Sequence, residues 1–424
     1  MMLNRIKFPA HQGNWRINNW KKKALACFIV PVFLSAGVYA QKTDRFMGEI
    51  VNYDESTVPA YTLPDILVTA KGKKIKNVAM WEKQRRRELL ALFEEHIYGK
   101  TPDGFDSLKF AVANEKADAM DGKAHLKEIT ITAWNDGRSV SFPVILFIPN
   151  KRIKPAPVFL LINNRSSRNT DPARIEKSTF WPAEMVIDSG YAIAAFHHSD
   201  VAPDRKDSYQ NGVLKQLFPA ELEKDNGIKA IGVWAWAASR VLDYFNTDKD
   251  IDFNKVALVG HSRGGKTALW SAAQDQRFAM VFSSCSGSTG AALARRKYGE
   301  TVSLIYKQFG YWFNNNYKKY SNDVNSLPVD QHMLIGLIAP RPVYTTNATE
   351  DRWADPYGSY LSLVHAKPVY DLYGRKVTLS NNMPDVNRPI IHSAIGYHFR
   401  EGKHDLNVFD WTNFIRFANH HFNR

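Results

Sequence analysis

Cysteine is scarce in this chain, whose 424 residues include only Cys27 and Cys285. Cys27 lies inside an apolar run with the features of an export signal, so the mature chain would keep one cysteine. A single cysteine can form neither an internal disulfide nor a cysteine-based zinc site. Hydrophobic residues make up 44% of the sequence, and a chain of this length can bury enough of them to be stabilised by its core.

The apolar run spans residues 24–38 and follows three lysines at 21–23. It ends in small residues at 38–40, directly before Gln41. A basic segment, an apolar run and a small-residue cleavage site are typical of a signal peptide. We therefore expect residues 1–40 to be removed, which gives a secreted or periplasmic bacterial protein with no membrane attachment after cleavage.

Two other readings of this N-terminal run remain open. An uncleaved signal anchor is one, but the run is short for a bilayer span, contains Pro31 and has no charge cluster after it. Lipidation of Cys27 is the other, but this cysteine lies in the middle of the run and not at a cleavage point.

The chain also lacks any run of Lys and Arg interleaved with aromatic residues. Its formal charge of +14 includes six basic residues and no acidic residue in 1–40, so +8 remains after cleavage. The remaining basic residues are spread along the chain, which is typical of solvated surface. We expect no nucleic-acid partner.

No internal repeat or low-complexity linker divides the rest of the chain. We therefore predict a single catalytic domain over 41–424, with an N-terminal extension over about 41–110 that contains a charged amphipathic helix at 82–98. Strands are predicted at 125–134, 139–148, 157–162, 192–196, 255–259, 279–283, 342–346 and 394–399, and helices at 227–245, 264–273 and 411–422. Antiparallel pairs followed by β-α-β alternation predict an α/β three-layer sandwich with a mostly parallel central sheet.

One strand runs directly into Gly260-His261-Ser262-Arg263-Gly264, and a helix follows without a break. A G-x-S-x-G sequence between a strand and a helix is typical of the nucleophile elbow of α/β-hydrolases, although the bare pattern also occurs in ordinary turns. The two glycines allow close backbone approach, and the helix N-terminus offers N–H groups to an oxyanion. We predict that Ser262 is the catalytic nucleophile.

A serine nucleophile needs a histidine as base, and the chain order in this fold is serine, acid, histidine. The histidines after Ser262 are His332, His365, His392, His398, His404, His420 and His421. His404 lies in a polar loop between the last strand and the closing helix, so we predict it to be the base, with a surface loop histidine as the alternative. His398 lies within the strand and is expected to be structural.

The acid should follow the strand predicted at 342–346, because catalytic groups gather at the carboxyl ends of such strands. The segment after that strand contains Glu350, Asp351 and Asp355. We choose Asp351. Asp355 and Glu350 are the fallbacks, and either could instead be a helix cap or a loop charge.

Six ordered segments resemble the bacterial glucuronoyl esterases of carbohydrate esterase family fifteen. They are residues 260–266, 290–296, 327–332, 339–342, 350–356 and 402–405, and the resemblance covers roughly residues 80–424. It implies an α/β-hydrolase that needs no metal or other cofactor. The implied substrate is an ester between glucuronic acid, or its 4-O-methyl form, on xylan and a lignin alcohol. We expect a glucuronoxylan or lignin-carbohydrate partner and a monomeric enzyme.

The resemblance also implies roles for residues around Ser262. By motif position, Arg263 would support the oxyanion through its backbone N–H, with its guanidinium as a second possible donor, while Lys266, Glu300 and Trp353 would hold the uronic sugar. A cation, a carboxylate and an indole suit sugar hydroxyls and a sugar face. From the residues alone, Lys266 and Glu300 would be interpreted as surface charges and Trp353 as core.

The chain departs from the family pattern at Cys285, where many members carry a glutamate. The resemblance implies that members without this glutamate use the aspartate of the Glu-Asp-x-Trp segment, here Asp351. A neutral thiol cannot replace a carboxylate charge at ordinary pH, so the level of activity stays open. Two alternatives remain: an acetyl or feruloyl esterase on the same fold, or a catalytically weak carbohydrate-binding homologue.

Overall fold

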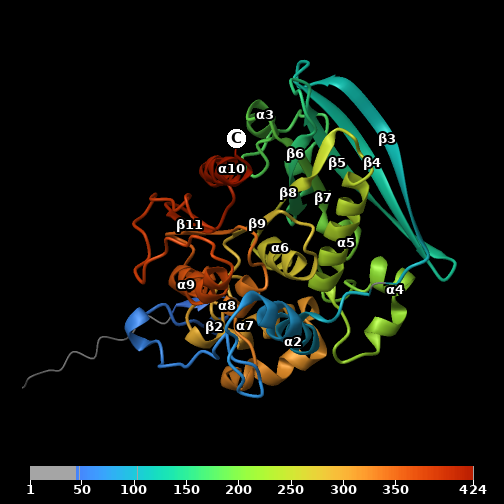
Figure 1. Cartoon of the computed structure of the whole chain (residues 1–424). Helices are drawn as coiled ribbons and strands as arrows, with labels where there is room; N and C mark the ends of the chain where they lie inside the picture. The colour runs from blue at the N-terminus through green and yellow to red at the C-terminus, as the bar shows by residue number, and fades with distance from the viewer. Residues whose placement is uncertain (1–43, 47, 103, 424) are drawn as a thin grey trace, which may run out of the picture. The chain divides into compact units, whose positions relative to one another are not determined.

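The computed structural model describes residues 44–46, 48–102 and 104–423 (Figure 1). The predicted signal peptide at 1–40 lies outside the described residues. Residues Thr43–Arg424 form one compact unit. Within the described part of that unit, no helix has both the length and the apolar content needed to cross a bilayer.

Over the described residues, nine strands form one sheet in the order β11-β10-β9-β8-β6-β7-β5-β4-β3. The strands are β3 Ser107–Ala119, β4 Ala124–Asn135, β5 Arg138–Pro149, β6 Ala156–Asn163, β7 Ala192–His197, β8 Ile251–His261, β9 Met280–Ser284, β10 Val343–Ala348 and β11 Ile395–Arg400. The six from β11 to β7 are parallel, and β5, β4 and β3 join antiparallel. The predicted mostly parallel α/β sandwich is confirmed.

Helices cover both faces of this sheet. On one face lie α2 Arg86–Phe93, α5 Ala230–Phe245, α6 Arg263–Gln274, α8 Gln331–Gly336 and α9 Pro356–Leu372, and on the other lie α3 Ala183–Asp188 and α10 Val408–Phe422. Figure 1 shows α10 and α3 on the opposite side of the strands from α5 and α6. Two apolar cores therefore flank a sheet whose central strand β6 is buried along its whole length, as its continuous apolar sequence predicts.

The helix predicted at 82–98 is part of a longer helical segment. It comprises α1 Val78–Met80, a π-helical turn at Trp81–Arg85, α2 and a second π-helical turn at Glu94–Tyr98. Leu89, Phe93 and Ile97 are fully buried, which confirms the apolar stripe. The N-terminal extension therefore contributes to the core on the α5 and α6 face.

Several elements were not predicted from the sequence, and the edge strand β3 and the helix α9 are two of them. The edge strand β3 has a short apolar alternation at Leu108, Phe110 and Val112, but its residues 111–118 are exposed on both faces and give no further strand signal. The helix α9 contains Pro368, a residue that usually ends helices. Its missing N–H and its ring are accommodated here within a helix of 17 residues.

Candidate active site

Ser262 occupies a sharp turn between β8 and α6. Its backbone has φ 55° and ψ −125°, a left-handed conformation that side-chain-bearing residues rarely adopt. A Cβ added at Gly260 would lie 2.0 Å from the carbonyl oxygen of Gly264, so this position requires glycine. The Ser262 N–H donates to the carbonyl of Ser284 at 2.8 Å, which ties the turn to the end of β9. The local geometry is that of a nucleophile elbow.

His404 and Asp351 come together at the same edge of the sheet. His404 Nδ1 lies 2.6 Å from Asp351 Oδ2, and the Asp351 side chain is only 3% exposed whereas that of His404 is 39% exposed. The ring of His404 lies 4.6 Å from that of His261, the residue before Ser262. The predicted histidine and aspartate are therefore paired beside the elbow that carries Ser262, with the aspartate in position to fix the histidine tautomer.

The fallback acids have other surroundings. Asp355 is buried, accepts the Gly358 N–H at 2.9 Å as the cap of α9, and pairs with Arg296 Nε at 2.9 Å. Burial raises the pKa of Asp355 to about 6 against the influence of Arg296. Glu350 is exposed. Neither carboxylate makes the contact to His404 that Asp351 makes.

Cys285 lies beside this histidine and aspartate pair. Its Sγ, an Asp351 carboxylate oxygen and a His404 ring nitrogen all lie within 4.8 Å of one another. Within the described ranges, this is the one group of three such side chains close enough to hold a metal ion. Burial raises the pKa of the Cys285 thiol well above its usual range, so the side chain stays neutral. The thiol adds no negative charge next to His404.

Two arginines hold the loop that carries His404. Arg165 Nη1 donates to Asp405 Oδ1 at 2.6 Å, and its Nη2 donates to the His404 carbonyl at 3.2 Å. From the opposite side, Arg400 Nη2 donates to the Asp405 carbonyl at 2.5 Å, and Arg400 Nε donates to both carboxylate oxygens of buried Asp410. Sequence reasoning missed both arginines.

The Asp351 and His404 loops are also joined through the backbone. The Thr349 N–H donates to the Arg400 carbonyl at 2.9 Å, and the Glu350 N–H donates to the Gly402 carbonyl at 2.9 Å. These bonds continue the β10–β11 pairing one step beyond the strands. The separation between the acid and the base is therefore fixed by the sheet itself.

Arg263 anchors its side chain to the loop after β6 and to Asp204. Its Nη2 donates to the Asn164 carbonyl at 2.9 Å, and its Nε forms an ion pair with Asp204. Burial opposes ionisation of Asp204, but a hydrogen bond from His198 and the Arg263 charge lower the pKa of Asp204 to about 2. Burial lowers the pKa of His198 to about 4. With its guanidinium anchored this way, Arg263 offers its backbone N–H, at the first position of α6, to an oxyanion.

Lys266, Glu300 and Trp353 form one cluster near the elbow. Lys266 Nζ lies 2.6 Å from Glu300 Oε2 and donates to the carbonyl of Ser286 at 2.7 Å. Trp353 Nε1 donates to Glu300 Oε1 at 3.2 Å, and the ring of Phe46 stacks on Trp353 with centroids 4.0 Å apart. Lys266 is 2% exposed and Glu300 7% exposed, so the surface-charge reading of these two residues is wrong.

The protonation of this pair reflects its burial. Burial lowers the pKa of Lys266 and raises the pKa of Glu300, while the attraction between the two charges opposes both changes. Trp353 is only partly buried, so it is not a core residue either. Lys266 uses its three N–H donors on Ser286, Ser288 and Glu300, so the carboxylate of Glu300 and the partly exposed indole of Trp353 are the groups suited to a polar ring with hydroxyl groups.

The comparisons with known proteins agree with one another. The family model for "Glucuronyl esterase, fungi" matches residues 131–374. The carbohydrate esterase MZ0003, from an unknown prokaryotic organism, is 38% identical over 435 residues, which covers 93% of this chain and 98% of that protein.

Solved structures give the same picture. A glucuronoyl esterase from Solibacter usitatus matches with a TM-score of 0.80 and 34% identity, covering 86% of this chain and 99% of that one. A promiscuous CE15 esterase from a marine bacterial metagenome matches with a TM-score of 0.80 and 37% identity, covering 88% of this chain and 100% of that one.

Proposed function

The chain belongs to the glucuronoyl esterases of carbohydrate esterase family 15, and from this we propose that it cleaves esters of glucuronic acid or 4-O-methylglucuronic acid through a serine acyl-enzyme. It is a carboxylic ester hydrolase. The physiological substrate that we propose is the ester between glucuronoxylan and a lignin alcohol. We also propose export of the chain after cleavage near Gln41.

The observation that carries the substrate class is the buried Lys266–Glu300 pair, one helical turn from Ser262. The opposite charges of the two residues neutralise each other, and the partly exposed indole of Trp353 lies beside them. An acetyl group is too small to reach this cluster from the serine, whereas a uronate ring extends from the reacting carbonyl by several ångströms. The cluster therefore favours a uronic acid over acetate.

The first half of the reaction forms the acyl-enzyme. His404 Nδ1–H donates to Asp351, which leaves Nε2 as the acceptor of the Ser262 hydroxyl proton. Ser262 Oγ attacks the uronate carbonyl carbon, and the backbone N–H groups at the start of α6 stabilise the negative oxygen. The tetrahedral intermediate collapses with loss of the alcohol, which takes the proton from His404 Nε2.

The second half reverses these roles with water. His404 takes a proton from water, whose oxygen attacks the acyl carbon bound to Ser262 Oγ. Collapse breaks the bond to Oγ and releases the uronic acid, while His404 returns the proton to Ser262. Asp351 stays ionised throughout and stabilises the imidazolium.

A panel of esters tests this function. We expect the wild-type enzyme to hydrolyse benzyl and methyl glucuronate faster than galacturonate, acetate or feruloyl esters. Ser262→Ala should abolish hydrolysis of all of them, whereas Ser326→Ala, a change at an exposed serine, should not alter kcat. Faster hydrolysis of acetate or feruloyl esters than of glucuronates would overturn the substrate class. Carbohydrate binding without hydrolysis of any ester would support the weak binding homologue instead.

A further inference from the structure

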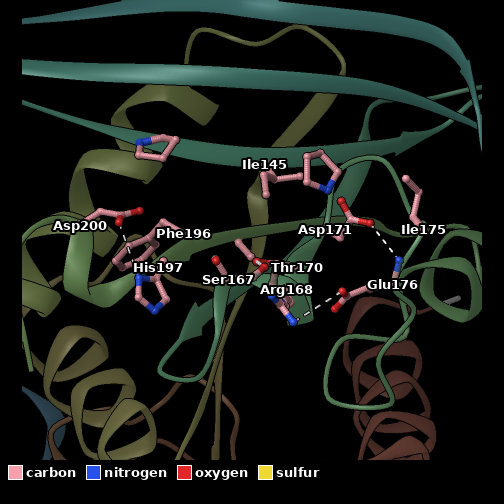
Figure 2. A pocket seen from close by; sticks show the side chains of 13 residues that line it. Ile145, Ser167, Arg168, Thr170, Asp171, Ile175, Glu176, Phe196, His197 and Asp200 are labelled. Atoms are coloured by element: carbon pink, nitrogen blue, oxygen red, sulfur yellow. Dashed lines mark hydrogen bonds and ion pairs between the residues drawn. The ribbon is translucent and has the colours of Figure 1, made fainter.

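A cavity lined by the carboxyl end of β7 opens on the face of the sheet that α3 and α10 cover. It has a volume of about 440 Å³ and lies between β5, β7 and the loop that follows β6 (Figure 2). Ile145 and Ala195 contribute to its floor, and His197 and Asp200 form one wall. This volume lies within the range of ordinary small-molecule sites, which is about 300–1,000 Å³.

We propose that this cavity is the subsite for a neutral aromatic alcohol portion of the ester. The inference rests on the proposed function and deepens it, because it assigns the alcohol portion of the ester to a particular cavity. It depends on three features of the described residues: the position of the cavity relative to Ser262, its physical connection to the elbow, and the character of its lining.

The strand order places the cavity and the proposed uronate cluster on opposite sides of Ser262. Lys266 donates to carbonyls of the segment after β9, on one side of β8. On the other side, β6 pairs with β8 through Ile162 and Gly260, and β7 pairs with β6 through His197 and Asn163. His197 is therefore two strands, or about 10 Å, from the β8 end. Since the two halves of an ester leave the carbonyl in opposite directions, an acyl group held near Lys266 directs the alcohol toward the cavity.

The wall of the cavity is continuous with the surroundings of the elbow. The ring of His198 contacts the Arg263 side chain. The ring of the preceding residue, His197, lines the cavity, and its centroid lies 5.2 Å from that of the His198 ring. The loop after β6 makes a second connection. Asn164 accepts from Arg263, and Asn163 donates to Thr170, another lining residue, at 3.2 Å.

The apolar part of the lining fits an aromatic ring. The side chains of Pro143, Ile145, Ala195 and Phe196 supply apolar surface on the sheet side. Ile175, in the loop that borders the cavity, is 86% exposed. A large apolar side chain left in water at the rim of a hollow gains by covering an apolar ligand.

The polar part of the lining favours a neutral ligand. Figure 2 shows two loose ion pairs at the rim, His197 with Asp200 at 3.6 Å and Arg168 with Glu176 at 4.0 Å. Asp171 adds a third carboxylate, so acidic groups outnumber basic ones and a second uronic acid would be repelled. Carboxylates can accept a phenolic hydroxyl, and an imidazole or guanidinium can pack on an aromatic face.

The test compares three glucuronate esters. One has methanol as alcohol, one a phenolic phenylpropanoid dimer long enough to reach the cavity, and one a neutral xyloside of similar length. Two variants change the cavity: Ile175→Asp, at an exposed position that does not threaten folding, and Ile145→Trp, which fills the floor. Ile153→Asp is the matched control, because Ile153 is 99% exposed and lies outside the cavity.

We expect both cavity variants to raise KM for the aromatic ester about five- to tenfold, with kcat and KM for the methyl ester unchanged. The control should change neither. An unchanged ratio of aromatic to methyl KM overturns the subsite while leaving the proposed function intact. An equal rise for the xyloside ester overturns its aromatic class. Failure of the wild-type enzyme to hydrolyse the methyl ester overturns the proposed function and the subsite with it.

Discussion

Arg165, in the loop after β6, donates hydrogen bonds to the carboxylate of Asp405 at 2.6 Å and to the carbonyl of His404 at 3.2 Å. The sequence separation between Arg165 and Asp405 is 240 residues. One guanidinium therefore positions the peptide next to the proposed base. In a third contact, Arg165 Nη2 lies 3.3 Å from Nε2 of His261, the residue before Ser262.

Replacing Arg165 with the shorter lysine should lower kcat more than it weakens substrate binding. We expect Arg165→Lys to lower kcat about tenfold with little change in KM, because a small displacement of a catalytic group costs rate steeply. Arg205→Lys, at an exposed arginine that pairs with Asp207, is the control. Steady-state kinetics on methyl glucuronate measures both constants. A loss confined to KM would contradict a positioning role for Arg165.

Removing the charge of Asp351 should be far more severe. We expect Asp351→Asn to lower kcat by roughly 10²–10⁴, because an amide neither stabilises the imidazolium nor fixes the productive tautomer. Asp355→Asn is the comparison, since Asp355 caps α9 and pairs with Arg296 without touching His404. It should lower the melting temperature and leave kcat nearly unchanged. If Asp355→Asn instead abolished turnover in folded enzyme, the acid would have to be reassigned.

Cys285 offers a way to move the acid. Its thiol lies within 4.8 Å of both His404 and Asp351. Its backbone already adopts φ 48° with a side chain present, so replacing the cysteine with another side-chain-bearing residue adds no backbone strain. We expect Cys285→Glu to restore part of the activity lost in Asp351→Asn, because a carboxylate would again face His404. Cys285→Gln in the same background is the control for size. Equal activity of the two double variants would exclude electrostatic rescue.

The Lys266–Glu300 pair can be separated into its structural and functional contributions. Lys266→Met should destabilise the fold by about 3–5 kcal/mol, because it leaves the Glu300 carboxylate buried without its partner. The double variant Lys266→Met with Glu300→Leu should recover much of that stability. We expect KM for methyl glucuronate to stay at least tenfold raised in the double variant, measured by kinetics beside urea unfolding. Recovery of KM together with stability would mean that the pair only supports packing.

Much of this site could be predicted because its signals are local. The Gly260-to-Gly264 pattern lies between a strand and a helix, and His404 occupies a polar loop between the last strand and α10. Arg165 and Arg400 had no such signal, since their contacts join loops that only the folded sheet brings together. The burial of Lys266 and Glu300 was equally invisible, because charged residues in a sequence are normally interpreted as surface. The edge strand β3 escaped prediction because its residues 111–118 are exposed on both faces and show no apolar alternation.

Buried neutral histidines should make the fold less stable in mild acid. Burial lowers the pKa of His332 to about 4, against about 6.5 in the unfolded chain. Between these two values the unfolded state binds more protons, so the free energy of unfolding falls as the pH decreases from about 6.5 to about 4 and levels off for this group below that. The difference of about 2.5 units corresponds to up to about 3 kcal/mol for His332.

Urea unfolding at several pH values measures this dependence. His332→Gln keeps a side-chain N–H for the Pro64 carbonyl, which His332 Nε2 contacts at 3.0 Å, but cannot be protonated. We expect the variant to have a lower free energy of unfolding at pH 7.5 and a flatter decline toward pH 4. The slope carries the test, because the packing change is the same at every pH. Parallel profiles for the two proteins would show that His332 does not cause the acid sensitivity.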